Sequence, residues 1–318
     1  MSFLERVVPV KLGYFTACLA HSELESIVPR AAQAGFSVLE VAAWPSQSRE
    51  HTAAHIDVRA LGPIEAAAIR ALLAQHGLEV SAISYYDNNL HPDEAERSRI
   101  HEHLRACIEA AAMLEVPCVG TFVGRDPRRT VTESLALAET IFPPLVDFAG
   151  ERGVKLVIEN CPMEGWHPDG YPGNLAYSLE LWEWMFSLGL YLNYDPSHLL
   201  WLGIDPVSAI HALGRDTGRI QHVQAKDTVI DPRGRDRYGV FGRALDRSSD
   251  PWSSGWWHYR MPGLGGVDWR GVIDALYQVG YDGAIAIEHE DPLWSGDEAK
   301  IYKGLEIARR TIQPLLVA

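Results

Sequence analysis

The sequence predicts an α/β protein, a single (β/α)8 TIM barrel formed by residues 1–318. Eight short apolar segments alternate with segments of helical periodicity, and no linker or change of composition divides the chain. Hydrophobic residues make up 47% of the sequence, enough for a large core. A doubly wound open sheet is the alternative, but neither GxGxxG nor GxxxxGK[ST] follows any strand. We therefore expect a closed barrel.

The predicted strands are rich in β-branched and aromatic residues and are too short to be helices. In chain order they are Leu12–Leu19, Ser37–Ala43, Glu79–Tyr86, Pro117–Val123, Val154–Asn160, Leu190–Asp195, Ile220–Asp227 and Gly283–His289. Several follow a glycine that is typical of a helix C-terminus, so each strand is expected to begin shortly after a helix ends.

The predicted helices lie between these strands and show a repeat of three to four residues. They are Leu24–Ala34, Pro63–His76, Glu94–Leu114, Val131–Arg152, Leu175–Leu188, Pro206–Gly214, Trp269–Val279 and Asp297–Leu316. Pro63 and Pro206 fall in a first helical turn, where proline is tolerated.

One connection is much longer than the others. After the seventh strand, residues 228–268 are charged, glycine-rich and tryptophan-rich, with no clear periodicity. Long connections in compact domains usually serve as lids or binding loops. We expect a long active-site loop here.

The charge balance excludes some partners. The chain has 28 Lys and Arg against 42 Asp and Glu, a net charge of −14, which opposes binding to nucleic acid or an anionic membrane. Its four cysteines form no CxxC motif, which favours a reducing cytoplasmic location. No apolar run reaches 18 residues, and Glu5 and Arg6 interrupt the region where a signal peptide would be apolar. We expect a soluble cytoplasmic protein with a small-molecule partner.

Three carboxylates stand at the ends of late strands. The fifth strand ends in Glu159, the sixth in Asp195 and the eighth in Glu288. The C-terminal ends of barrel strands carry the active site, and ionised groups there are costly unless they are paired or bound to metal. Ion pairs with lysine or arginine are the alternative interpretation. Acidic residues on several late strands favour the metal.

The seventh strand adds an imidazole. Two-residue alternation places His222, Gln224 and Lys226 on one face of that strand. Three carboxylates and one imidazole form a mixed oxygen and nitrogen ligand set, which suits Mn²⁺, Mg²⁺ or Co²⁺ and is compatible with Zn²⁺. We expect one divalent metal ion, with Mn²⁺ the first choice.

These residues lie in motifs that resemble the xylose-isomerase-like superfamily, which includes sugar phosphate isomerases and epimerases. The matching stretches are VIENCPMEGW (157–166), LNYDPSHLLW (192–201), HVQAKD (222–227), YRMPGLGGVDW (259–269) and IAIEHED (285–291). The first half matches more loosely, through SVLEVAAWP (37–45) and SAISYYDNNLHPD (81–93). The resemblance implies a TIM barrel that binds one divalent metal and acts on a sugar, without defining which sugar.

The resemblance also implies the roles of the site residues. The metal ligands would be Glu159, Asp195, His222 and Glu288. Glu159 and Glu288 would also be the catalytic pair, one removing a proton α to a carbonyl and the other returning it. A metal that bridges carbonyl and hydroxyl oxygens would stabilise the cis-enediolate, and carboxylates on its two faces would allow inversion. This implies a metal-dependent sugar isomerase or epimerase.

Five further side chains are candidates for substrate binding. His198, in the DPSH motif, either approaches the substrate oxygens or caps the following helix. Lys226 and Arg260 either donate to an oxygen-rich substrate or balance the acidic cluster. Glu164 resembles a family position that contacts a substrate hydroxyl. Trp166 either forms an apolar wall for the sugar or packs in the rim.

A metal-dependent lyase of the same barrel is the main alternative. After α-deprotonation, a leaving group on the β-carbon would depart instead of the proton returning. Inosose dehydratases, and α-subunits of C-glycoside deglycosidases that act on 3-keto glycosides, also resemble this chain. The aromatic residues of 228–268 could hold a flat aglycone. This version fits a hetero-oligomer with a second subunit, while the first is compatible with a homo-oligomer.

Two other functions have less support. Metal-dependent apurinic endonucleases of the same superfamily carry extra histidines at the ends of strands three and four, where this chain has SYYD (84–87) and FVGR (122–125). A degenerate barrel that only binds sugar or serves as a scaffold would have no reason to keep three costly carboxylates.

Overall fold

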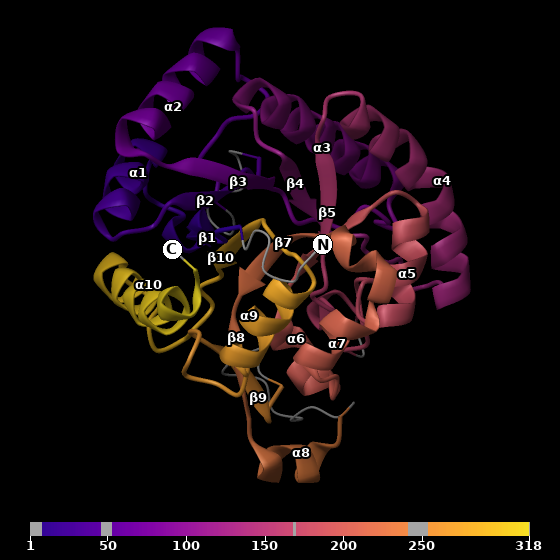
Figure 1. Ribbon diagram of the computed structural model, residues 1–318. Helices are drawn as coiled ribbons and strands as arrows, with labels where there is room; N and C mark the ends of the chain where they lie inside the picture. Colours follow the sequence, from indigo (N-terminus) through magenta and orange to yellow (C-terminus); the bar gives the residue numbers. More distant parts are fainter. Residues whose placement is uncertain (1–7, 46–52, 168–169, 241–253, 318) are drawn as a thin grey trace.

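The computed structural model describes residues 8–45, 53–167, 170–240 and 254–317. Eight parallel strands close into a barrel in the order β1, β2, β3, β4, β5, β6, β7 and β10, as the sequence predicts (Figure 1). Their bounds are β1 Lys11–Phe15, β2 Val38–Ala42, β3 Glu79–Ser84, β4 Cys118–Thr121, β5 Lys155–Glu159, β6 Tyr191–Tyr194, β7 Ile220–Ala225 and β10 Ala284–Ile287. The first strand ends earlier than expected, because residues 16–19 turn into a 3-10 helix.

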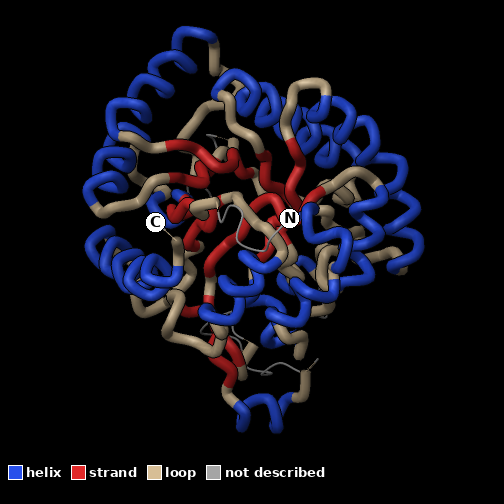
Figure 2. The backbone as a smooth tube through the Cα atoms, viewed as in Figure 1, coloured by secondary structure: helices blue, strands red, loops and turns tan. Residues whose placement is uncertain are grey.

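Helices surround the strands on the outside of the barrel (Figure 2). They are α1 Leu24–Gln33, α2 Pro63–His76, α3 Glu94–Leu114, α4 Val131–Gly150, α5 Leu179–Ser187, α6 Pro196–Leu202, α7 Pro206–Ala212, α8 Pro232–Tyr238, α9 Trp269–Gln278 and α10 Glu298–Ile312. Short 3-10 turns lie at Thr16–Leu19, Glu164–Trp166, Gly214–Arg219 and Gln313–Leu315. Helix α2 shows how the sequence sets these bounds: Pro63 starts it, and Gly77 ends it with a left-handed φ of 65°.

The long connection after β7 is more regular than predicted. Strands β8 (Asp227–Ile230) and β9 (Trp257–Arg260) pair antiparallel beside the barrel, and α8 follows β8 (Figure 1). A helix of seven residues is too short to show a periodic pattern, and a four-residue strand shows little alternation. The prediction of an irregular 228–268 loop is therefore corrected over its described part. Residues 241–253 of that loop lie outside the described residues.

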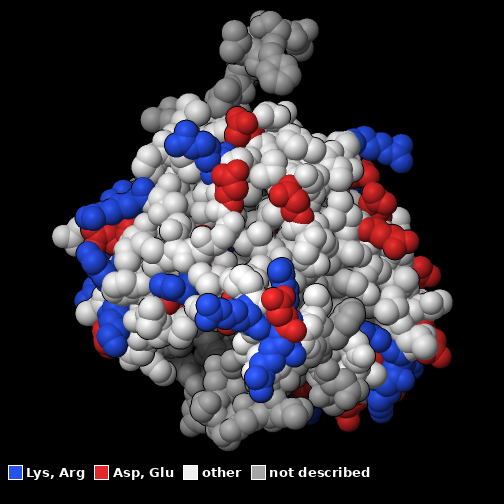
Figure 3. All heavy atoms as spheres, turned by 90° about the horizontal axis from the view of Figure 1, so that it is seen from below, with Lys and Arg blue, Asp and Glu red and all other residues white. Residues whose placement is uncertain are grey.

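The apolar core lies between the strands and the helices that surround them. Ile27 of α1, Ile108 of α3, Phe142 of α4 and Trp182 of α5 are completely buried against it. On the face shown in Figure 3, Lys and Arg side chains are interspersed with Asp and Glu. Among the residues that the structure describes, no helix is long and apolar enough to cross a bilayer.

Candidate metal and active site

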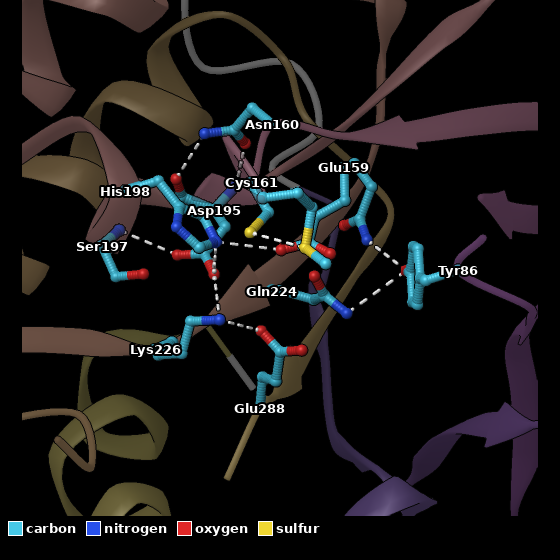
Figure 4. Close-up of polar contacts among 12 residues, drawn as sticks. Tyr86, Glu159, Asn160, Cys161, Asp195, Ser197, His198, Gln224, Lys226 and Glu288 are labelled. Carbon is cyan, nitrogen blue, oxygen red and sulfur yellow. Dashed lines mark hydrogen bonds and ion pairs between the residues drawn. The ribbon is translucent and has the colours of Figure 1, made fainter. Parts of the chain in front are cut away.

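Four buried side chains converge at the C-terminal end of the barrel. Glu159 is the last residue of β5, Asp195 follows β6, and Glu288 follows β10. His198 comes from the first turn of α6. One ligand atom from each of the four lies within 4.8 Å of the others, and the side chains point toward one another (Figure 4). The three carboxylates therefore lie together at the C-terminal ends of their strands.

The DPSH motif explains how His198 reaches this cluster. Asp195 is the N-cap of α6, and its Oδ1 accepts a hydrogen bond from the backbone amide of Ser197 at 2.8 Å. The turn that follows brings His198 Nε2 to 3.0 Å from Glu159 Oε1 and 3.3 Å from Asp195 Oδ2. Its Nδ1 lies 2.9 Å from the hydroxyl of Tyr259. Both ring nitrogens therefore have partners, and the ring is held in one orientation.

Lys226 brings a positive charge into the same cluster. Its Nζ lies 2.5 Å from Glu288 Oε2 and 3.4 Å from Asp195 Oδ2. It also lies 2.9 Å from Glu290 and 4.4 Å from the centre of the Tyr259 ring. Only 1% of the surface of Lys226 is exposed. An ammonium in such a place is tolerated because the carboxylates surround it.

Burial and neighbouring charges shift the pKa values of these groups in different directions. Burial raises the pKa of Glu159, and His198 and Lys226 offset only part of that rise. Burial also raises the pKa of Glu288 well above its usual range, despite the nearby Lys226 ammonium. For Asp195, burial acts upward too, but His198 and Lys226 outweigh it and lower the pKa to about 2. The pair Glu159 and Glu288 is therefore easier to protonate than Asp195.

His222 does not join the cluster, contrary to the expectation that it completes the ligand set. Its Nε2 lies 2.9 Å from Ser81 Oγ and its Nδ1 lies 2.9 Å from Asn193 Oδ1. It lines a separate cavity at the N-terminal end of the barrel, together with Lys11 and Glu79. The physical reason is the position of His222 along the strand. Two-residue alternation predicts which face of a strand a side chain occupies, but side chains two residues apart on one face are separated by about 6.6 Å along the strand. His198 is the imidazole beside the carboxylates.

The chemistry of the cluster fits a divalent cation. Asp195 Oδ2 is buried and makes only the ion-pair contacts with His198 and Lys226, and Gln224 Oε1 is buried with no hydrogen-bond partner within the described part of the chain. Buried oxygens without a donor are unusual and are natural ligands for a hard cation. The Cys161 thiol also lies near Glu159 and His198, but burial raises its pKa to about 11, which favours the neutral thiol. The donor set is thus mainly oxygen, as Mn²⁺ and Mg²⁺ prefer.

A cavity of about 580 Å³ opens over the cluster and is lined by Glu159, Lys226 and Glu288. Glu164, like Lys226 a predicted substrate residue, also lines the cavity, and so does Tyr259, which the sequence did not single out. An aromatic wall faces these polar groups and consists of Phe15, Trp44, Tyr86 and Phe122. A cavity with one polar and one aromatic side suits a sugar-sized ligand.

Two predicted substrate residues lie away from this cavity. Trp166 packs edge-on against Phe122 of the aromatic wall, with ring centres 5.5 Å apart. The Arg260 Nε donates to the buried Asp291 at 2.8 Å. These contacts agree with the packing interpretation for Trp166 and with the charge-balance interpretation for Arg260.

The structure also shows site residues that the sequence did not single out. Glu40 of β2 is completely buried in the barrel and accepts hydrogen bonds from Ser84 Oγ and the Tyr86 hydroxyl, both at 2.7 Å. Gln224 Nε2 donates to both carboxylate oxygens of Glu40 at 3.1 Å. The signal for Glu40 was one charged residue inside the apolar run SVLEVAA. Tyr259 gave none, because nothing in the sequence pairs it with His198.

Comparisons with known proteins agree with this architecture. A family model described as a xylose isomerase-like TIM barrel matches residues 28–311. The uncharacterized protein YfiH of Bacillus subtilis (strain 168) is 26% identical over 324 residues, which cover 95% of this chain and 99% of that protein.

One further relative and one solved structure of the same fold are named as enzymes. An inosose dehydratase of Geobacillus kaustophilus (strain HTA426) is 27% identical over 275 residues, covering 79% of this chain and 80% of the dehydratase. Among solved structures, a D-psicose 3-epimerase with D-tagatose from Clostridium cellulolyticum H10 superposes with a TM-score of 0.67 at 15% identity. That superposition covers 97% of this chain and 100% of the epimerase, and it shows a shared fold.

Proposed function

The chain belongs to the xylose isomerase-like TIM-barrel family, and from this premise we propose that it is a divalent-metal-dependent isomerase or epimerase of keto sugars. One observation carries the proposal: ligand atoms of Glu159, Asp195, His198 and Glu288 lie within 4.8 Å of one another beneath the cavity. The relatives named as a dehydratase and an epimerase support the same class of chemistry, since both reactions can begin with loss of a proton next to a carbonyl.

The three carboxylates are the residues that would hold the ion, with His198 beside them as the donor to Glu159. Mn²⁺ is the expected ion, and Mg²⁺, Co²⁺ and Zn²⁺ are the alternatives. When bound, it would act as a Lewis acid on the carbonyl and neighbouring hydroxyl oxygens of the sugar. The buried Lys226 ammonium adds fixed positive charge beside the same oxygens, which favours the cis-enediolate.

Glu159 and Glu288 are the proposed acid and base. They come from β5 and β10, which are separated by β6 and β7 in the barrel, so they approach the cavity from different strands. Each has its own donor: His198 Nε2 lies 3.0 Å from Glu159, and Lys226 Nζ lies 2.5 Å from Glu288. These donors stabilise the anionic base, while burial raises both pKa values toward those of a group that can also return a proton.

A lyase that uses the same first step is the second candidate. The inosose dehydratase relative favours it, because its alignment spans 79% of this chain. The buried Lys226 also favours it: an ammonium next to Glu288 would stabilise a hydroxyl or aglycone that leaves from the β-carbon. The two candidates share a substrate carbonyl and differ only in what happens to the enediolate.

Proton exchange in D₂O tests the proposal. The purified protein with Mn²⁺ is incubated with a panel of ketoses and inososes, and deuterium at the α-carbon is followed by NMR. Exchange with return of sugar supports the isomerase or epimerase, and loss of water or an aglycone supports the lyase. No exchange with any substrate, together with no bound metal by elemental analysis, would refute both.

Single variants then test the acid and base. We expect Glu159→Gln and Glu288→Gln each to slow exchange by at least about 100-fold, the usual contribution of a positioned acid or base. Asp282→Asn is the matched control, because Asp282 lines the cavity at the opposite end of the barrel. Full exchange in either glutamine variant would contradict the two-base assignment.

A further inference from the structure

Gln224 holds an unusual position next to the acidic cluster. It lies in β7, two residues before Lys226, and its side chain is completely buried. Its Nε2 has three close acceptors, but its Oε1 has no hydrogen-bond donor within the described part of the chain. A buried amide oxygen without a partner is costly, so its position calls for an explanation.

The orientation of this amide is fixed by chemistry. Glu40 accepts from Gln224 Nε2 through both of its oxygens at 3.1 Å, and a carboxylate can only accept. The Tyr86 hydroxyl donates to Glu40 at 2.7 Å, so it faces Gln224 Nε2, at 3.2 Å, as an acceptor. A flipped amide would place its oxygen against a carboxylate. The nitrogen therefore faces Glu40, and the oxygen faces the carboxylate cluster (Figure 4).

Glu40 has no other evident task. It lies on β2, and its described partners are all neutral donors: Ser84, Tyr86 and Gln224. A buried carboxylate that receives hydrogen bonds from a neighbouring side chain is a common way to fix the orientation of a metal ligand. An uncharged acceptor such as an amide oxygen would fix Gln224 less firmly, because an amide can itself flip.

We propose that Gln224 Oε1 is a ligand of the divalent cation and that Glu40 is its positioning residue. The inference rests on the proposed function, since it assumes that Glu159, Asp195 and Glu288 hold a cation. The neutral carbonyl oxygen makes the ligand set harder than one with an imidazole in its place would be, which favours Mn²⁺ and Mg²⁺ over Zn²⁺. It also leaves the His198 ring to its partners Glu159 and Tyr259.

Titration of the metal-free full chain with Mn²⁺, followed by the EPR signal of the free ion, tests the proposal without any substrate. We expect Gln224→Leu, which removes the oxygen at similar volume, to weaken Mn²⁺ binding at least about tenfold. Ser81→Ala is the control, because Ser81 also lies inside the barrel but contacts His222 instead. Thermal unfolding of each variant checks that it is folded. Equal Mn²⁺ affinity of Gln224→Leu and wild type would overturn the proposal.

A second variant keeps the test independent of Gln224→Leu folding. Gln224→His replaces the oxygen by an imidazole, so the ratio of Zn²⁺ to Mn²⁺ affinity should rise by about tenfold or more. An unchanged ratio would show that the ion does not touch this position. If wild type binds none of Mn²⁺, Mg²⁺, Co²⁺ and Zn²⁺, the proposed function fails as well. If wild type binds one of these ions and the Gln224 variants bind it equally well, the proposed function stands and only the inference about Gln224 fails.

A double-mutant cycle tests the role of Glu40. Glu40→Gln should weaken Mn²⁺ binding about 10- to 100-fold in wild type. In the Gln224→Leu background it should have little further effect, because the residue through which it acts is gone. An equal loss in both backgrounds would mean that Glu40 acts through its charge alone, and it would overturn the positioning role.

Discussion

Asp227 ties the long connection after β7 to the barrel. Its side chain is completely buried, and its two oxygens accept four hydrogen bonds. Oδ1 accepts from the backbone amides of Thr228 and Val267, both at 2.9 Å. Oδ2 accepts from the backbone amide of Gly263 at 2.9 Å and from the Trp269 indole at 3.1 Å. Residues 263–269 therefore fold around one carboxylate.

Asp227→Asn tests this reasoning, because an amide can accept at only one of its two positions. Whichever oxygen is replaced, two N–H groups lose their acceptor, and at least one of them is buried. An unsatisfied buried donor costs about 1–3 kcal/mol, so the free energy of unfolding should fall by at least about 1–3 kcal/mol. Urea unfolding measures this change. We also expect lower kcat, because β9, which pairs with β8, carries the Tyr259 hydroxyl that contacts His198.

The control is Asp231→Asn. Asp231 caps α8 and accepts a bond from the Arg233 amide at 3.0 Å. Asn is as good an N-cap as Asp, so this variant should stay within about 0.5 kcal/mol of wild type. If Asp227→Asn and Asp231→Asn unfold at the same urea concentration, the four bonds to Asp227 do not hold the connection as argued.

Three further outcomes are expected. Dialysis against EDTA should abolish turnover and Mn²⁺ should restore it; turnover that resists the chelator would contradict a metal-dependent reaction. Tyr259→Phe should lower kcat about three- to tenfold, because it removes one neutral hydrogen bond to His198, and unchanged kinetics would count against that contact. Burial opposes ionisation of Asp291, but bonds from Arg260 and two backbone amides lower its pKa below the unfolded value. The ionised carboxylate therefore adds stability above about pH 4, and this stability is lost as the pH falls. The difference in unfolding free energy between wild type and Asp291→Asn should shrink below pH 4, and a difference independent of pH would refute this.

The barrel itself could be predicted because its strands carry a strong local signal. Each of the eight predicted apolar runs overlaps one barrel strand, and the helices with clear periodicity lie where expected. The elements that were missed are α6 and α8, of seven residues each, and the ribbon of β8 and β9. Two turns of helix show too little of a 3.6-residue repeat to detect. The ribbon is fixed by pairing between distant residues, such as Asp227 with Arg260, which no local pattern encodes.

The site shows the same division between what is local and what is not. A position at a strand end could be read from the sequence, and the structure brings Glu159, Asp195 and Glu288 together there. The position of a side chain along the strand could not be read in this way: His222 shares a face of β7 with Lys226 but lies four residues away, about 13 Å along the strand. His198 reaches the carboxylates because a helical turn folds it back, and the sequence left that role open.

The charges of the buried cluster lead to the ion that the proposed function requires. Glu159, Asp195 and Glu288 carry three negative charges when ionised, and Lys226 supplies one positive charge at 2.5 Å from Glu288. Glu290, the other partner of Lys226, is 47% exposed, so water screens it. With a neutral His198, three minus one leaves two negative charges in a buried volume, and such an excess is strongly unfavourable. A divalent cation would bring the sum to zero, whereas a neutral fourth ligand such as Gln224 would leave that balance unchanged. An ionised carboxylate at position 224 would add a further negative charge and disturb that balance, which is a physical reason for an amide there.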